Sequence, residues 1–118
     1  MSEQKPIDWP QELVSELTRL GIECAELEAA AKLLEDSKHS VLCTIKLTFS
    51  TSEKSDAGRE TLARATDQFK DYLVEMATAR EKAAIARVKY DAQDMLCRLR
   101  QTQVSMRKAR INAEMAHT

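Results

Sequence analysis

The stretch LVSELTRLGIECAELEAAAKL, residues 13–33, decides the fold. Its apolar residues recur in alternating steps of four and three residues, and the repeat continues as far as Ile45. The repeat positions are Leu13, Leu17, Leu20, Cys24, Leu27, Ala31, Leu34, Lys38, Val41 and Ile45. A stripe that recurs every 3.5 residues packs along its length against another helix. The sequence therefore predicts a coiled-coil helix that pairs with another part of this chain or with a second chain.

A second repeat of seven residues occupies the C-terminal half. It runs through Phe69, Met76, Ala83, Tyr90, Cys97, Val104 and Ile111, with Tyr72, Ala79 and Ala86 as companion positions. After Tyr90 the companion positions become polar, while Ala92, Leu96, Leu99 and Met106 form another apolar face. Because a two-helix hairpin covers only one side of each helix, we expect a second subunit to cover this face. The sequence thus predicts a homo-oligomeric bundle of four or more helices.

We expect a single all-α domain over residues 1–118, folded as a long antiparallel helical hairpin. The first helix is expected at about 9–48, a polar loop at about 50–58, and the second helix at about 59–115. A kink or break is expected near Thr66, where Thr66 or Asp67 can cap a new helix. Residues 41–49 also alternate like a strand, but no second strand is available to pair with them, so we favour a helix.

The composition agrees with long helices. Of 118 residues, 43% are apolar, 31% charged and 4% aromatic, and the chain has only two Gly and two Pro. This profile is typical of long helices rather than of a thick globular core. Gly21 is the weak point of the first helix, because a helical Gly costs about 1 kcal/mol relative to Ala. We find no apolar run of membrane-spanning length and no signal segment, so we expect a cytoplasmic protein without membrane contact.

Charge is distributed unevenly although the net charge is only −1. Residues 1–37 hold nine acidic and three basic side chains, whereas residues 80–110 hold nine basic and three acidic ones. One interpretation is that the two oppositely charged helix ends lie side by side in an antiparallel hairpin. Another is that an exposed basic ladder contacts nucleic-acid phosphates. The residues of this ladder are Arg98, Arg100, Arg107, Lys108 and Arg110.

Two observations bear on the nucleic-acid interpretation. The basic stretch has no interleaved aromatic residues on which bases could stack. Four acidic side chains of the first helix can also neutralise its charge: Glu12, Glu16, Glu23 and Glu26. If these four carboxylates instead form an uncovered row, they would suit an inhibitor that mimics nucleic acid.

We find no catalytic constellation, and we expect no enzyme activity, no cofactor, no metal site and no small-molecule substrate. His39 and His117 are interpreted as solvated surface residues. Cys24, Cys43 and Cys97 are interpreted as reduced packing residues, because their number is odd and their spacing is wide. Trp9 is interpreted as a staple at the helix start, and Met95, Met106 and Met115 as core-filling residues.

The segment FKDYL at residues 69–73, followed by Met76, Ala79-Arg80, Ala83, Ala86-Arg87 and Tyr90-Asp91-Ala92, resembles small helical accessory proteins of tailed bacteriophages and prophages. The similarity spans about residues 60–112. The resemblance implies a phage accessory protein from a region devoted to DNA recombination or replication, and it brings no catalytic residues. We therefore expect an oligomeric coiled-coil interaction module with a protein partner. The alternatives are a DNA- or RNA-binding helper and an inhibitor of a host enzyme.

Overall fold

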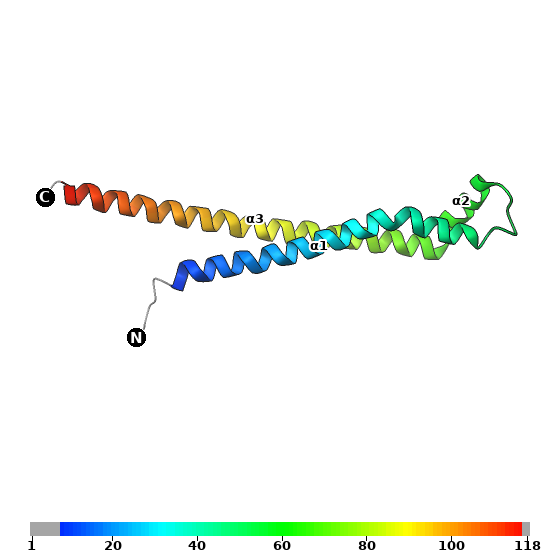
Figure 1. The fold of residues 1–118 in the computed structure, drawn as a ribbon, viewed down its shortest axis with the longest axis horizontal. Helices are drawn as coiled ribbons and strands as arrows, with labels where there is room; N and C mark the ends of the chain where they lie inside the picture. The colour runs from blue at the N-terminus through cyan, green and yellow to red at the C-terminus, as the bar shows by residue number, and fades with distance from the viewer. Residues whose placement is uncertain (1–7, 117–118) are drawn as a thin grey trace. The chain divides into compact units, whose positions relative to one another are not determined.

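The computed structural model describes residues 8–116 and contains three helices in that range. They are α1 (Asp8–Leu47), α2 (Asp56–Arg64) and α3 (Asp67–Ala116), shown in Figure 1. The all-α prediction is confirmed, and the described residues include no strand. Residues 41–47, which also fitted a strand pattern, are the last two turns of α1.

The chain divides into two compact units. One is Ala25–Ile85, which we call the turn unit. The other consists of Met1–Cys24 and Ala86–Thr118, and we call its described part the end unit. Both α1 and α3 contribute residues to each unit, and α2 lies entirely within the turn unit.

Contacts between α1 and α3 run in opposite directions along the two helices. In the turn unit, the Tyr72 hydroxyl donates to the carbonyl oxygen of Leu34, and Arg80 Nε lies 2.5 Å from Glu35 Oε2. Earlier in α3, Phe69 joins a core cluster with residues near the end of α1. Advancing along α3 therefore moves back along α1. The predicted antiparallel helical hairpin is confirmed.

The same direction of pairing holds within the end unit. Gln93 Nε2 and Cys97 Sγ both donate to the carbonyl oxygen of Leu13, at 3.2 and 3.6 Å. Tyr90, which comes earlier in α3, lies against Gly21, which comes later in α1. The two side-chain donors hold the first turns of α1 against α3.

Burial follows the two repeats until the seam ends. The buried seam residues are Leu20, Cys24, Ala31 and Ile45 on α1, and Phe69, Met76, Ala83 and Ala86 on α3. Half-buried positions are Leu13, Leu17, Leu27, Leu34 and Tyr90. By contrast, Val104 and Ile111 are 41% and 46% exposed, and every side chain from Gln101 to Ala116 is exposed. The seam within this chain thus ends before the last two repeat positions of α3.

The connection between α1 and α2 is shorter than the loop expected at 50–58. α1 ends at Leu47 and α2 begins at Asp56, so residues 56–58 belong to a helix. Ser55 is the reason: it is the N-cap, and its hydroxyl accepts a hydrogen bond from the Gly58 amide at 3.0 Å. An N-cap side chain that satisfies an unpaired amide lets a helix begin earlier than a loop-like composition indicates.

The second helix is divided into α2 and α3 by a break at Ala65 and Thr66. Thr66 Oγ1 accepts a hydrogen bond from the Phe69 amide at 3.2 Å, so Thr66 caps α3 as the sequence indicated. The expected helix at 59–115 is therefore two helices, because the cap replaces the backbone hydrogen bonds that a continuous helix would make.

Polar contacts fix the loop between α1 and α2. The Arg59 guanidinium donates to the carbonyl oxygens of Glu53 and Lys54 at 2.8 and 2.9 Å. Lys46 Nζ lies 2.8 Å from Asp56 Oδ1, which joins the end of α1 to the start of α2. The hydrogen bond from Lys46 lowers the pKa of Asp56, and the same hydrogen bond raises the pKa of Lys46. Both ends of the loop are thus tied to neighbouring helices.

An apolar cluster holds the three helices of the turn unit together. It consists of Leu42, Ile45, Ala63 and Phe69, with Val41 and Phe49 packed against it. Ala63 has no exposed surface, and Phe69 is only 1% exposed. A residue as small as alanine at position 63 lets α2 approach the ends of the two long helices closely.

We predict that Phe69→Ala destabilises the protein by about 3–5 kcal/mol, because it removes the largest side chain of this cluster and leaves a cavity. Leu62→Ala is the matched control, since Leu62 is 39% exposed on the same short helix and should cost much less. Urea unfolding followed by circular dichroism measures both free energies of unfolding. Equal losses in the two variants would show that the cluster is not the core of the turn unit.

Candidate interaction surfaces

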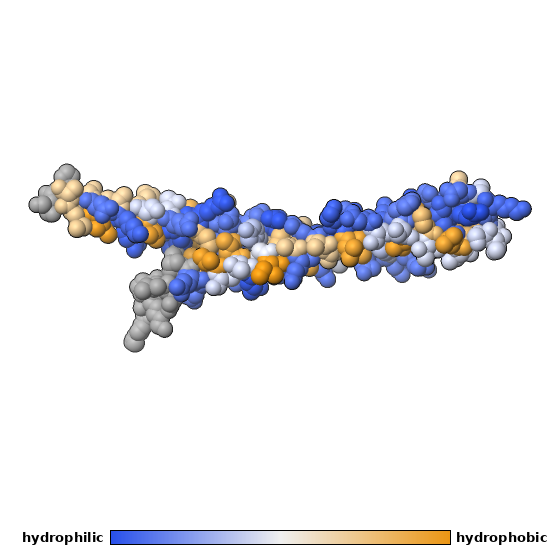
Figure 2. Space-filling view, in the orientation of Figure 1, coloured by the Kyte–Doolittle hydropathy of each residue, from blue (hydrophilic) through white to orange (hydrophobic). Residues whose placement is uncertain are grey.

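An uncovered apolar stripe runs along α3 in the end unit. Val88, Ala92, Met95, Leu99 and Met106 follow one another in steps of four, three, four and seven residues. These steps place them on one face of a helix, with Thr102 completing the repeat. Val88 is 68% exposed, Met95 64%, Leu99 55% and Met106 61%. We call these five residues the outer stripe, and apolar surface is visible on the C-terminal part of α3 in Figure 2.

The outer stripe is separate from the seam. At about 100° per residue, Leu99 lies roughly 160° around the helix from Cys97 of the seam. Leu96, beside the stripe, is 38% exposed. Met95, Met106 and Met115 were expected to fill the core, and that expectation is wrong for the single chain because all three side chains are exposed. The sequence indicated part of this face through Ala92, Leu96, Leu99 and Met106, but not its extension to Val88 and Met95.

The structure places all five residues of the basic ladder on the exposed surface of α3. They do not share one face. Arg98 and Arg107 are nine residues apart, which is about half a revolution of the helix. Arg98 Nη2 also lies 3.1 Å from Asp94 Oδ2, and Arg100 Nη1 donates to Gln103 Oε1 at 3.2 Å. Arg107 and Arg110 lie one turn apart, so they remain neighbours in space.

The four glutamates of α1 lie along one side of the helix, as their spacing of four, seven and three residues requires. Arg19 lies among them. Its Nη2 is 2.6 Å from Glu16 Oε2 and its Nη1 is 3.5 Å from Glu23 Oε1. The hydrogen bond from Arg19 lowers the pKa of Glu16. A cation of α1 itself therefore neutralises the middle of the acidic row.

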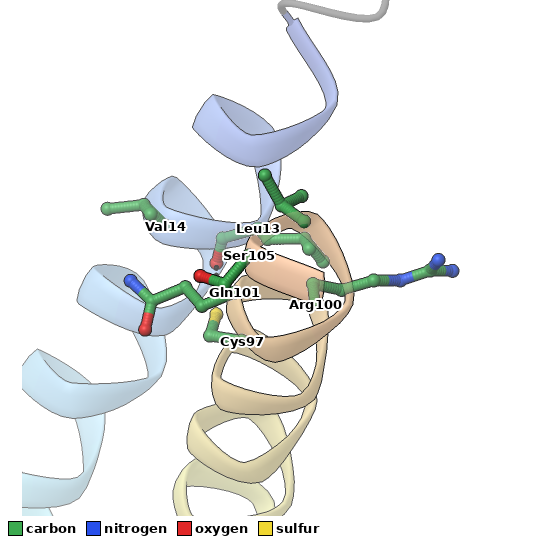
Figure 3. Close-up of a pocket in the computed structure, with 7 residues that line it drawn as sticks. Leu13, Val14, Cys97, Arg100, Gln101 and Ser105 are labelled. Atoms are coloured by element: carbon green, nitrogen blue, oxygen red, sulfur yellow. Dashed lines mark hydrogen bonds between the residues drawn. The ribbon is translucent and has the colours of Figure 1, made fainter. Parts of the chain in front are cut away.

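A groove marks the place where the seam ends. It has a volume of about 430 Å³ and is lined by Leu13, Val14, Cys97, Arg100, Gln101, Val104 and Ser105. Figure 3 shows Cys97 pointing toward α1, whereas the guanidinium end of Arg100 points away from the groove. The repeat of α1 begins at Leu13, whereas the repeat of α3 continues to Val104. Val104 therefore has no facing repeat position on α1. The groove offers apolar walls but no set of reactive groups.

Gly21, the weak point of the α1 sequence, has a packing role. A Cβ atom at this position would lie 3.0 Å from Cε1 of Tyr90. The Arg87 guanidinium lies over the Tyr90 ring, with its Cζ 5.5 Å from the ring centre. The absence of a side chain at position 21 therefore lets the tyrosine ring lie directly against α1.

We predict that Gly21→Ala destabilises the protein when Tyr90 is present, because the added methyl group meets the ring. In a Tyr90→Ala background the same change should instead stabilise it by about 1 kcal/mol, the difference in helix propensity. A double-mutant cycle by thermal or urea unfolding measures this coupling. Stabilisation of similar size in both backgrounds would contradict the packing role of Gly21.

Two reactive side chains lie together elsewhere on α1. His39 Nε2 and Cys43 Sγ are 3.4 Å apart, one helical turn from each other. The sequence interpretation held that neither histidine has a histidine or cysteine four residues away, and this is wrong for His39, because Cys43 lies at that spacing. Among residues 8–116, no group of three or more His, Cys, Asp and Glu side chains is arranged to hold a metal ion.

The remaining predictions fall at the ends of the chain. The side chain of Trp9 and the whole of His117 lie outside the described residues. Within residues 8–116, none of the helices has both the length and the apolar character that crossing a membrane requires.

Comparisons with known proteins found no matching family model, no matching curated protein and no matching solved structure. By its fold, this protein is an all-α helical hairpin.

Proposed function

We propose that this protein is a non-enzymatic interaction module that associates with a second copy of itself through the outer stripe of α3. The observation that supports the proposal is the exposure of four large apolar side chains, Val88, Met95, Leu99 and Met106, in a coiled-coil repeat. Contiguous apolar surface of this kind marks interaction sites in proteins.

The energetics of the outer stripe are adequate for association. Burying one Val, Leu or Met side chain contributes about 1.5–3 kcal/mol. Each copy offers four such side chains, whereas the loss of translational and rotational freedom costs roughly 4–15 kcal/mol. The two magnitudes are comparable, so burial of the two stripes can offset the cost of association.

Charge gives this association a distinctive salt dependence. Residues 80–110 hold nine basic and three acidic side chains, so two α3 helices repel each other. Salt screens this repulsion while leaving the apolar contact in place. Association through the outer stripe should therefore strengthen as the salt concentration rises.

We predict that Val88→Ser with Leu99→Ser shifts the protein to the monomer, because both changes remove apolar surface from the centre of the stripe. Light scattering over a range of protein and salt concentrations measures the mass. Val74→Ser with Leu33→Ser is the matched control, since these side chains are 65% and 67% exposed outside the outer stripe.

The control variant should keep the mass of the unchanged protein. A monomeric unchanged protein at high concentration, or an equal loss of mass in both variants, would overturn the proposed association. Circular dichroism establishes that each variant retains its helices.

A second candidate function is nucleic-acid binding by Arg107, Lys108 and Arg110. The structure favours it because these side chains are exposed, and no ion pair joins them to another described residue. The sequence has no acidic residue between Asp94 and Glu114. Lysine and arginine side chains presented in this way suit phosphate groups, with affinity that falls as salt rises.

We predict that the double variant Arg107→Glu, Arg110→Glu loses measurable DNA binding if this second function holds. The variant should stay folded because both residues are exposed. Fluorescence anisotropy with short single-stranded and duplex DNA at several salt concentrations measures it. Lys54→Glu with Lys70→Glu is the control for net charge, since both residues are exposed in the turn unit. Equal weakening in the two variants would indicate a general charge effect without a binding site.

The resemblance of residues 60–112 supports placing this module among phage or prophage accessory proteins, within a bacterial host cell. The inhibitor alternative has less support, because Arg19 interrupts the acidic row that nucleic-acid mimicry would need.

A further inference from the structure

The side chains of His39 and Cys43 lie next to each other on α1. Both belong to α1 in the turn unit, one turn apart, and His39 Nε2 lies 3.4 Å from Cys43 Sγ. His39 is exposed and Cys43 is half-buried, so a dissolved ion can reach both. Neither residue is a position of the α1 seam, and neither belongs to the outer stripe of α3.

The separation of the two ligand atoms matches the geometry of zinc. Zinc lies about 2.0–2.1 Å from a histidine nitrogen and about 2.3 Å from a cysteine sulfur, with tetrahedral angles. These bond lengths place the nitrogen and the sulfur about 3.6 Å apart. The observed 3.4 Å requires only a small adjustment of side-chain torsions. Imidazole and thiolate ligands also favour zinc, whereas magnesium and calcium favour oxygen ligands.

We propose that His39 and Cys43 bind a thiophilic divalent cation such as Zn²⁺, and that the same pair from a second copy of this chain completes the site. Two side chains fill half of a tetrahedral shell, and the described residues provide no third ligand nearby. A second His39 and Cys43 would give two nitrogen and two sulfur ligands, a set found in structural zinc sites. Each thiol loses its proton to solvent when the metal binds, while the imidazole binds in its neutral form.

The test uses Co²⁺ as a spectroscopic substitute for Zn²⁺, with the full chain reduced beforehand and the reductant removed under nitrogen. We expect a thiolate-to-cobalt charge-transfer band together with intense visible bands of tetrahedral cobalt. Zn²⁺ should displace the cobalt at a ratio of one ion for two chains. Light scattering should show that Zn²⁺ doubles the mass of the Val88→Ser, Leu99→Ser variant, in which the outer stripe is removed as a contact.

Matched variants separate this site from other thiols. Cys43→Ser and His39→Ala should each weaken Co²⁺ binding at least tenfold, and circular dichroism establishes that each variant keeps its helices. Cys97→Ser is the control, because Cys97 also follows a polar residue by one turn but donates to the carbonyl oxygen of Leu13. It should leave binding unchanged.

The outcomes are decisive. Absence of a charge-transfer band, or a band that survives Cys43→Ser or His39→Ala, overturns the chelate. One ion per chain without a change of mass overturns completion by a second copy. Because these readouts do not involve the outer stripe, they can fail while the proposed function stands, and the reverse also holds.

Discussion

The structure depends on the burial of one apolar seam between two antiparallel helices. A single helix has no core of its own. α1 and α3 are therefore stabilised by burying their apolar faces against each other. Small residues on the seam, among them Ala31, Ala83 and Ala86, are buried and let the helix backbones approach. Gly21 extends the same principle into the end unit, where the absence of a side chain lets the Tyr90 ring contact α1.

Register along the seam is set by a few polar contacts added to the apolar ones. The hydroxyl of Tyr72 and the guanidinium of Arg80 reach across from α3 to Leu34 and Glu35 of α1. In the end unit, Gln93 takes over this role by donating to the Leu13 carbonyl oxygen. A shift of one turn would break these bonds without changing the apolar pattern, so polar side chains select one alignment among several that the seam alone permits.

The functional argument follows from what the seam leaves uncovered. A hairpin covers one side of α3, and the opposite side carries an apolar repeat from Val88 to Met106 that the protein does not use internally. Beyond the seam, α3 is exposed and carries Arg107, Lys108 and Arg110, which no ion pair joins to another described residue. These two surfaces predict opposite responses to salt, because screening favours contact between like-charged helices and weakens contact with phosphate. Self-association and nucleic-acid binding can therefore be distinguished by a physical variable rather than by analogy.

The sequence by itself determined the helices, the seam and the antiparallel pairing, because a repeat of 3.5 residues and a polarised charge pattern are properties of the chain before it folds. It also located the cap at Thr66, since a hydroxyl three residues before a helical amide is a local signal. Tertiary structure alone decided how Ala63 brings α2 into the core, which carbonyl oxygens of α1 the side chains of Tyr72 and Gln93 reach, and where along α3 the seam ends. These features depend on which of several nearby groups each side chain contacts. That is set by packing between segments far apart in the sequence, which no local pattern encodes.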